Sequence, residues 1–266
     1  MARVHLHIEA GCAVISFDNP PTGLLTAAMV GEFETALDGA LTSEDVRVLV
    51  LTGTVPGVMI RHFDLADLAQ AANALAETPV QQPARWDDSV FHRLTRRLET
   101  CAVPVIAAIN GDCMGVGFEI ALACDIRIAQ AGGFSLGLPE MNLAMFPGGG
   151  GTVRLARALG VARALEWIAT ARVVSPDEAL AHGLVSEVVA DPLARAWEMA
   201  GAMAARSPGA IAATKRLVHA AQGSDLEAAL SLEQQAVNER LGSAQVRRRL
   251  EAYLRSDADL RDFIAD

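Results

Sequence analysis

The chain has 266 residues, of which 52% are hydrophobic and 20% charged, so it is large and apolar enough to bury a substantial core. Its formal net charge is −10, and no basic block is longer than Arg247–Arg249, which argues against nucleic acid as a partner. The apolar runs are strand-sized and far shorter than the roughly 20 residues of a membrane-spanning helix, so we expect no membrane segment.

The N-terminus enters strand-like sequence directly, without the apolar core and cleavage site of a signal peptide, which predicts a cytoplasmic location. Residues 4–17 alternate apolar and polar side chains around a turn at Gly11, as in a hairpin. His5 and His7 fall on its solvent face, so we predict no metal site there. A helix over 26–41 and a buried strand over 46–51 follow.

The alternation of helices and strands continues toward the middle of the chain. The patterns predict a helix over 88–99, a strand over 103–109, a helix through 119–124 and a strand over 125–129. No strand pattern remains after Asp191. We therefore predict an α/β core over residues 1–190 and an all-helical region over 191–266, with no internal repeat.

Helix starts are well marked in the second half of the chain. Ser175 precedes Pro176 and lies three residues before Glu178, the arrangement of an N-cap, a proline at the first position and a capping glutamate. Asp191 and Ser207 also precede prolines, and Ser224 begins another predicted capping box.

The most informative segment is 110–119, Asn-Gly-Asp-Cys-Met-Gly-Val-Gly-Phe-Glu, which follows a buried strand and opens a helix. Its glycines allow a sharp turn and leave backbone N–H groups free for an anion or a polarised carbonyl. A dinucleotide fingerprint is excluded because Ile120 stands where that motif needs Gly or Ala, and no Lys-Ser/Thr pair follows for a phosphate loop.

This segment resembles the N-G-x-x-x-G-x-G-x-E signature of the crotonase superfamily, the enoyl-CoA hydratase/isomerase family. Three further segments resemble the family in order and spacing: Leu138-Pro139-Glu140, the Pro147–Leu155 stretch of the form P-G-x-G-G-T-x-R-L, and the helix-then-G-L-V segment 175–189. Together the matches cover roughly residues 3–220, and four ordered matches are far more specific than any one alone.

The resemblance implies a fold and a site. The fold would be an α/β spiral of ββα turns with a C-terminal helical trimerisation region, in trimers that usually pair into hexamers. The thioester oxygen would be held by the backbone N–H groups of Phe63 and Val116, and Glu119 and Glu140 would hold and activate water. Arg61, His62, Asp64, Gly115 and Gly117 would contact the substrate and its coenzyme A portion.

General chemistry supports the same residues. Hydration of an unsaturated thioester needs an oxyanion hole, a base for water and an acid for the α-carbon, and two carboxyl groups in different environments can divide the last two roles. Taken singly, Glu119 would be read as a glutamate that interacts with the helix dipole, and Glu140 as a surface charge. Within the four ordered segments we predict that both are catalytic.

The chain departs from the family at two places. The family's A-G-A-D is replaced by Arg61-His62-Phe63-Asp64, in which Asp64 is predicted to cap the next helix. Either the backbone geometry is kept and the new side chains point away, or His62 joins the chemistry or Arg61 contacts a phosphate of coenzyme A. The family's basic K-R-x-P-x-F ending is also missing from 255–264.

We therefore predict an enoyl-CoA hydratase that acts on acyl-CoA as its partner molecule, without metal or other cofactor, as a homotrimer or hexamer. The alternatives are another reaction of the superfamily, double-bond isomerisation or thioester hydrolysis, and a non-catalytic protein that binds coenzyme A or acts as a scaffold. The RNA-binding role of some relatives is disfavoured by the acidic charge.

Overall fold

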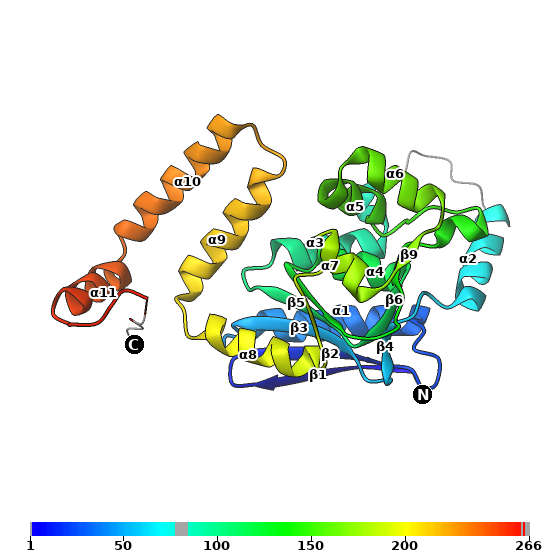
Figure 1. Ribbon diagram of the computed structural model, residues 1–266, viewed down its shortest axis with the longest axis horizontal. Helices are drawn as coiled ribbons and strands as arrows, with labels where there is room; N and C mark the ends of the chain where they lie inside the picture. The colour runs from blue at the N-terminus through cyan, green and yellow to red at the C-terminus, as the bar shows by residue number, and fades with distance from the viewer. Residues whose placement is uncertain (1, 78–84, 262, 264–266) are drawn as a thin grey trace.

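The computed structural model describes residues 2–77, 85–261 and 263. Residues 78–84 of the predicted core, and 262 and 264–266 of the predicted helical region, lie outside this part. Figure 1 shows a body of strands and helices from which the last helices extend to one side. Within the described residues no helix is both long and apolar enough to cross a membrane.

A six-stranded sheet forms the centre of the body. Its strands, in spatial order, are β1 (Arg3–Glu9), β2 (Cys12–Asp18), β3 (Val48–Gly53), β5 (Val105–Ile109), β7 (Ile126–Gln130) and β10 (Glu187–Val189). β1 and β2 form the predicted antiparallel hairpin, and the other neighbours are parallel. The two central strands β3 and β5 are apolar at nearly every position because both of their faces are buried.

A second, four-stranded sheet was not predicted. Its strands are β4 (Gly57–Ile60), β6 (Gly111–Met114), β8 (Leu136–Gly137) and β9 (Val173–Val174). β4, β6 and β8 are parallel, and β9 runs antiparallel to β8. Since these strands have two to four residues, they are too short to carry a periodic pattern.

The chain passes repeatedly from the large sheet to the small sheet and then into a helix. β3, β4 and α2 form one such turn, β5, β6 and α4 the next, and β7, β8 and η2 a third. The helices of the body are α1 (Ala27–Thr42), α2 (Leu65–Glu77), α3 (Val90–Thr100), α4 (Val116–Ala123), α5 (Gly151–Leu159), α6 (Val161–Ala169) and α7 (Pro176–Ala181), with the 3-10 helices η1 (Trp86–Asp88) and η2 (Glu140–Leu143). This succession confirms the predicted spiral of ββα turns.

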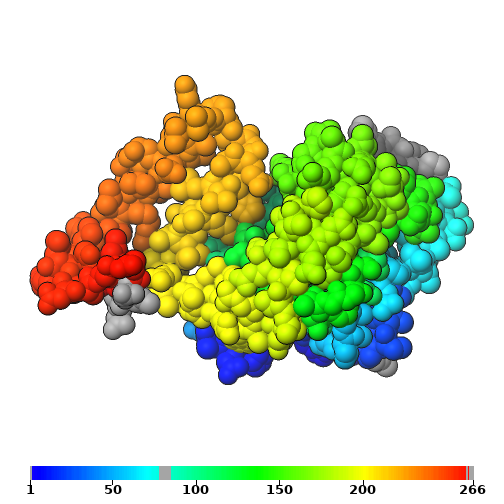
Figure 2. Space-filling model, in the orientation of Figure 1, coloured from blue at the N-terminus to red at the C-terminus, as the bar shows by residue number. Residues whose placement is uncertain are grey.

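The all-helical region begins at α8 (Pro192–Ala204) and continues through α9 (Pro208–Ala221), α10 (Leu226–Leu241) and α11 (Ala244–Leu254). α8 belongs to the body, because its Ala196 and Ala200 pack on the face of the large sheet that α1 and α4 do not cover. α10 and α11 extend beyond the body (Figures 1 and 2).

Most predicted helix starts are confirmed. The side chains of Ser175 and Asp191 accept hydrogen bonds from the N–H groups of Glu178 and Ala194. Two details differ from the prediction. Ser207 is the N-cap residue of α9, as predicted, but its hydroxyl donates to the side chain of Gln245 on α11 and makes no cap hydrogen bond.

The second difference concerns α10. Asp225, and not Ser224, is its N-cap: the Asp225 carboxylate accepts a hydrogen bond of 2.9 Å from the Ala228 N–H. Both side chains are suitable caps, and a carboxylate also gains from the helix dipole at this position.

Lys215, the single lysine of the chain, fixes α9 to the body. Its buried ammonium group lies 2.8 Å from Asp125 Oδ2 and donates to the carbonyl oxygens of Leu98 and Val103 at 2.7 and 2.9 Å. His219, one turn later on α9, pairs with the other oxygen of Asp125 at 2.7 Å. An ammonium group with this many acceptors offsets the cost of its burial.

Lys215→Met should lower the free energy of unfolding by about 3 kcal/mol, because it leaves the Asp125 carboxylate and two carbonyl groups without their cation. Urea denaturation followed by circular dichroism measures this. Arg216→Met is the matched control, since Arg216 is exposed on the same helix, and it should change stability by less than about 0.5 kcal/mol. Equal effects of the two substitutions would contradict the role given to Lys215.

Candidate active site

The predicted site residues follow the three parallel strands of the small sheet. Residues 61–64 follow β4, 115–119 follow β6, and Glu140 follows β8 by three residues. Because the strands are parallel and adjacent, their carboxyl ends lie along one edge of the sheet. The small sheet, absent from the sequence prediction, is therefore what brings the predicted residues together.

Gly115 is the point at which these segments meet. It has a φ of +54°, and a Cβ atom on it would lie 3.3 Å from Glu140 Oε1 and 3.6 Å from the Cβ of His62. Gly117, two residues later, is needed for packing: a Cβ atom there would lie 2.4 Å from the carbonyl oxygen of Ile60. Glycine at both positions lets α4 begin directly against the end of β4.

Glu119 lies in the first turn of α4 and is only 3% exposed. Its Oε1 accepts hydrogen bonds from the N–H groups of Gly149 and Gly151, at 2.7 and 2.8 Å. Burial raises the pKa of Glu119, and the two N–H donors and the charges of Arg154 and His92 oppose that rise. The carboxyl group is thus held in one orientation by backbone donors.

Glu140 is the first residue of η2 and is partly buried. Its Oε2 is shielded from solvent and has no hydrogen-bond partner among the described residues. Burial raises the pKa of Glu140 from 4.5 to about 7, a hydrogen bond from its own backbone opposes this, and the negative charge of Glu119 adds to it. The two glutamates therefore affect each other, but Glu119 accepts from two donors of another segment, whereas the hydrogen bond to Glu140 comes from its own backbone.

Two backbone N–H groups at this edge have no acceptor within the described residues. They belong to Phe63, which follows β4, and Val116, the first residue of α4. Leu25 pairs with the loop on both sides of Phe63. The Leu25 N–H donates to the His62 carbonyl oxygen, and the Leu25 carbonyl oxygen accepts from the Asp64 N–H. The loop is fixed while the Phe63 N–H stays unused, as an oxyanion hole requires.

The side chains of the altered loop have separate surroundings. The Phe63 ring packs edge-on against Phe91 of α3, with centroids 5.6 Å apart, and Asp64 caps α2 by accepting from the Ala66 N–H at 2.8 Å. Arg61 lies 3.8 Å from Asp112. These contacts agree with a loop whose backbone geometry is kept, and they confirm the predicted cap.

His62 remains beside the site. Its Nδ1 lies 2.7 Å from the carbonyl oxygen of Phe63, and that carbonyl can only accept, so Nδ1 carries the proton and Nε2 is left available. The ring is half-buried next to Gly115.

Sequence reasoning missed the groups that hold Glu119. The glycine run 148–151 was recognised only as part of a family segment, and its donors were not assigned to Glu119. Arg154, which donates to the Gly149 carbonyl oxygen, was likewise quoted only as part of that family segment, and Thr95, whose Oγ1 lies 3.3 Å from the same oxygen, was not singled out. The contact of Thr95 with Gly149 spans 54 residues of sequence, so no local signal could reveal it, whereas Arg154 is only five residues from Gly149.

The raised pKa of Glu140 makes stability depend on pH. Between pH 4.5 and 7 the unfolded chain loses this proton before the folded protein does, so stability should fall as pH rises and then level off. Glu140→Gln removes the ionisation and should make the protein more stable than wild type at pH 8, by up to about 3 kcal/mol, with little difference at pH 4.5.

Urea denaturation across this pH range checks the prediction. Glu198→Gln is the control, because that side chain is 71% exposed and far less affected by folding. Parallel pH profiles for wild type and Glu140→Gln would show that Glu140 ionises normally in the folded protein.

Comparison with known proteins agrees with this geometry. Residues 7–258 match the family model described as enoyl-CoA hydratase/isomerase. The chain is 33% identical to a probable enoyl-CoA hydratase of Bacillus subtilis, over 96% of both chains, and 31% identical to a short-chain-enoyl-CoA hydratase of Clostridium acetobutylicum, over 89% of this chain and 88% of the other. A crystal structure of enoyl-CoA hydratase from Bacillus anthracis superimposes with a TM-score of 0.83 at 31% identity, covering 94% of this chain and 95% of that one. The chain belongs to the enoyl-CoA hydratase/isomerase family of the crotonase fold.

Proposed function

We propose that this protein is an enoyl-CoA hydratase, which adds water across the α,β double bond of an acyl-CoA thioester. The observation that carries the proposal is the pair Glu119 and Glu140, one buried and one partly buried carboxyl group in unlike surroundings, beside two backbone N–H groups that have no acceptor among the described residues. The names of its relatives, which include enoyl-CoA hydratases of two bacteria, support the same reaction.

The thioester oxygen would accept hydrogen bonds from the Phe63 and Val116 N–H groups. Both are main-chain donors, so the identity of their side chains does not remove them. The Val116 N–H also lies at the start of α4, where the helix dipole favours negative charge. These donors would stabilise the enolate oxygen that forms as water adds to the β-carbon.

The two carboxyl groups would divide the proton transfers. The N–H groups of Gly149 and Gly151 favour the ionised form of Glu119, which leaves Oε2 to accept a proton from water. Glu140, with a pKa of about 7 and no donor on Oε2, is partly protonated at neutral pH and suits the role of acid.

In the proposed step the water oxygen forms a bond to the β-carbon and gives a proton to Glu119. The π electrons of the double bond move toward the α-carbon and the thioester oxygen, and Glu140 protonates the α-carbon. One water molecule is added, and the coenzyme A thioester stays intact. Coenzyme A takes part as a portion of the substrate, and the step uses no metal or other cofactor.

Glu119→Gln and Glu140→Gln should each lower the rate of crotonyl-CoA hydration by roughly 10² to 10⁴, with little change in acyl-CoA affinity, because each removes one proton transfer. Loss of the double-bond absorbance of crotonyl-CoA measures the rate, and calorimetry measures the affinity. Glu198→Gln, on the exposed face of α8, should be unaffected, and His62→Ala should have a small effect.

Other outcomes favour the alternative reactions. If Glu119→Gln keeps most of the activity while Glu140→Gln abolishes it, isomerisation by one base is the better account. If His62→Ala is the most damaging change, the altered loop carries the chemistry. If no acyl-CoA binds, the protein is not an enzyme of this class.

We also propose that the helices after Asp191 mediate assembly into a trimer, or into a hexamer of paired trimers. Support comes from α10 and α11, which extend from the body and expose many apolar side chains. These are Leu226, Leu230, Leu232, Val237, Leu241, Leu250 and Leu254, each more than 40% exposed.

Sedimentation velocity at micromolar concentration should give a trimer or a hexamer for the wild-type protein. Leu230→Asp should shift the distribution toward smaller species, because it places a charge within an apolar contact. Gln235→Asp adds the same charge at an exposed polar position of the same helix and should leave assembly unchanged. A monomeric wild-type protein would contradict the proposal.

A further inference from the structure

The glycine turn that holds Glu119 is itself held from the opposite side. The Gly149 N–H donates to Glu119, while the Gly149 carbonyl oxygen accepts from Arg154 Nη1 at 3.1 Å. Thr95 Oγ1 also lies 3.3 Å from this oxygen, although its single hydrogen is closer to the Phe91 carbonyl oxygen, at 2.8 Å. Thr95 lies on α3 and is 1% exposed. The orientation of the donors to Glu119 therefore depends on side chains that do not touch the carboxyl group themselves.

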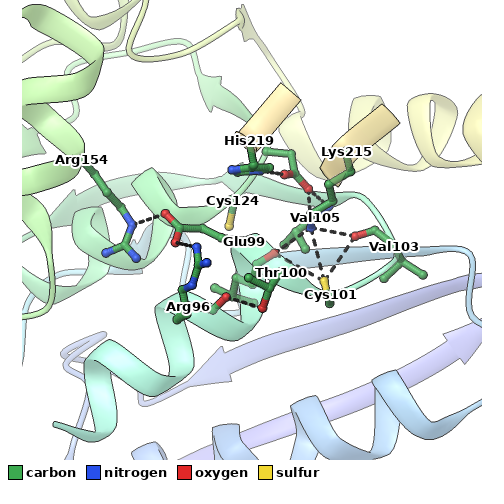
Figure 3. Close-up of polar contacts among 12 residues, drawn as sticks. Arg96, Glu99, Thr100, Cys101, Val103, Val105, Cys124, Arg154, Lys215 and His219 are labelled. Carbon is green, nitrogen blue, oxygen red and sulfur yellow. Dashed lines mark hydrogen bonds and ion pairs between the residues drawn. The ribbon is translucent and has the colours of Figure 1, made fainter. Parts of the chain in front are cut away.

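Arg154 is in turn fixed by Glu99. Arg154 Nε lies 2.7 Å from Glu99 Oε1, and the two side chains are only 12% and 10% exposed. Figure 3 shows the Glu99 carboxylate between Arg154 and Arg96. Burial acts to raise the pKa of Glu99, but the hydrogen bond and charge of Arg154, aided by Arg96, hold it below its ordinary value. Glu99 thus stays ionised and keeps the guanidinium in place.

The backbone is shaped to admit this guanidinium. Gly150 has a φ of +103°, and a Cβ atom on it would lie 2.0 Å from Arg154 Nη1. Any other residue at this position would displace the group that holds the Gly149 carbonyl. Arginine is also needed, since Nε and Nη1 reach Glu99 and Gly149 in one rigid fork, which a single ammonium group cannot reproduce.

We propose that Arg154 and Glu99 are positioning residues for Glu119, acting through the glycine turn 149–151. Arg154 donates to the Gly149 carbonyl oxygen and so fixes the turn. The turn then directs the Gly149 and Gly151 N–H groups at Glu119 Oε1, and Glu119 Oε2 stays free for the substrate. This inference rests on the proposed function only in naming hydration as the reaction that Glu119 serves.

The helix that carries Glu99 and Thr95 is anchored at its C-terminal end, next to Glu99. Lys215 of α9 donates to the Leu98 carbonyl oxygen, and Figure 3 shows its ammonium group at the C-terminal end of α3. A shift of α3 would therefore move both contacts on the Gly149 carbonyl together. The charge of Arg154 also opposes the rise in the pKa of Glu119, so Arg154 acts on both the position and the ionisation of that group.

The test compares Arg154→Met, Arg154→Lys and Glu99→Gln with Arg195→Met. Arg195 is the matched control: it makes two hydrogen bonds to Glu187, at 2.7 and 2.9 Å, away from the site. Three quantities are measured in the full-length protein. Steady-state kinetics with crotonyl-CoA gives kcat and KM, and the side-chain carboxyl ¹³C signal of Glu119, assigned by its loss in Glu119→Gln, gives the pKa of that group.

Arg154→Met should lower kcat about 10- to 100-fold with KM nearly unchanged, since misplacement of a catalytic group costs this much. It should also raise the pKa of Glu119. Arg154→Lys should keep the pKa near that of wild type but recover little of kcat, because it restores the charge and not the two-point contact. Glu99→Gln keeps the side-chain shape and should lower kcat in the same direction, so it replaces Arg154→Met as the test if that variant does not fold.

The proposal is overturned if Arg154→Met, or Glu99→Gln in its place, matches Arg195→Met in both kcat and the pKa of Glu119. A wild-type protein that does not hydrate enoyl-CoAs would sink the proposed function but not this result, because the Glu119 signal still reports whether Arg154 controls it.

Discussion

A buried carboxyl group stays ionised only if hydrogen-bond donors or positive charges replace the water that it has lost; otherwise it becomes protonated. This constraint at Glu119 determines much of the structure around it. The donors are the N–H groups of Gly149 and Gly151. To bring them close, the turn must be free of side chains on the side of Glu119: a Cβ atom on Gly149 would lie 2.8 Å from Glu119 Oε2, and one on Gly151 would lie 2.9 Å from Oε1. The glycine run thus follows from burial of one carboxyl group.

The same constraint is met differently at Glu140. Its Oε2 is buried and has no hydrogen-bond partner in the part of the chain that the structure describes, and burial raises the pKa of Glu140 to about 7. Two carboxyl groups near each other are thus kept unlike: Glu119 accepts from two backbone donors of another segment, and Glu140 Oε2 accepts from no donor among the described residues. Unlike surroundings of this kind are how proteins separate an acid from a base. This arrangement lowers the stability of the folded protein, because Glu140 Oε2 is a buried acceptor without a donor among the described residues. A glutamine at this position would destabilise the fold less at neutral pH.

Long, patterned elements could be predicted from the sequence, and short or long-range ones could not. The predicted strand over 103–109 and helix over 88–99 are close to β5 and α3. A strand buried on both faces has a continuous apolar run, and a helix buried on one face has apolar residues at a helical period, so both patterns can be recognised in the sequence. β4, β6, β8 and β9 are too short for this, so the sheet that assembles the site was missed. Glu119, Glu140 and Asp64 were predicted through family segments, and the role of Asp64 as a cap was predicted from its position before a helix.

The supporting residues of the site were out of reach for a different reason. Glu99 and Arg154 are 55 positions apart, and nothing in either neighbourhood marks them as a pair. At Ser207 the local sequence predicted a side-chain cap, but the Ser207 hydroxyl donates to Gln245, which is distant in sequence, and does not cap the helix. Local sequence patterns predict structure that depends on neighbouring residues. The contacts inside this site form between segments that meet only in the folded chain.

The position at which water oxygen enters the product tests the central claim most directly. Incubation of the wild-type protein with crotonyl-CoA in H₂¹⁸O, followed by mass spectrometry, should give 3-hydroxyacyl-CoA with one ¹⁸O on the β-carbon and the thioester intact. Labelled free carboxylic acid with release of coenzyme A would mean thioester hydrolysis, and recovery of unlabelled acyl-CoA alone would mean that the protein does not hydrate. Either result would contradict the assignment of Glu119 and Glu140 to the addition of water.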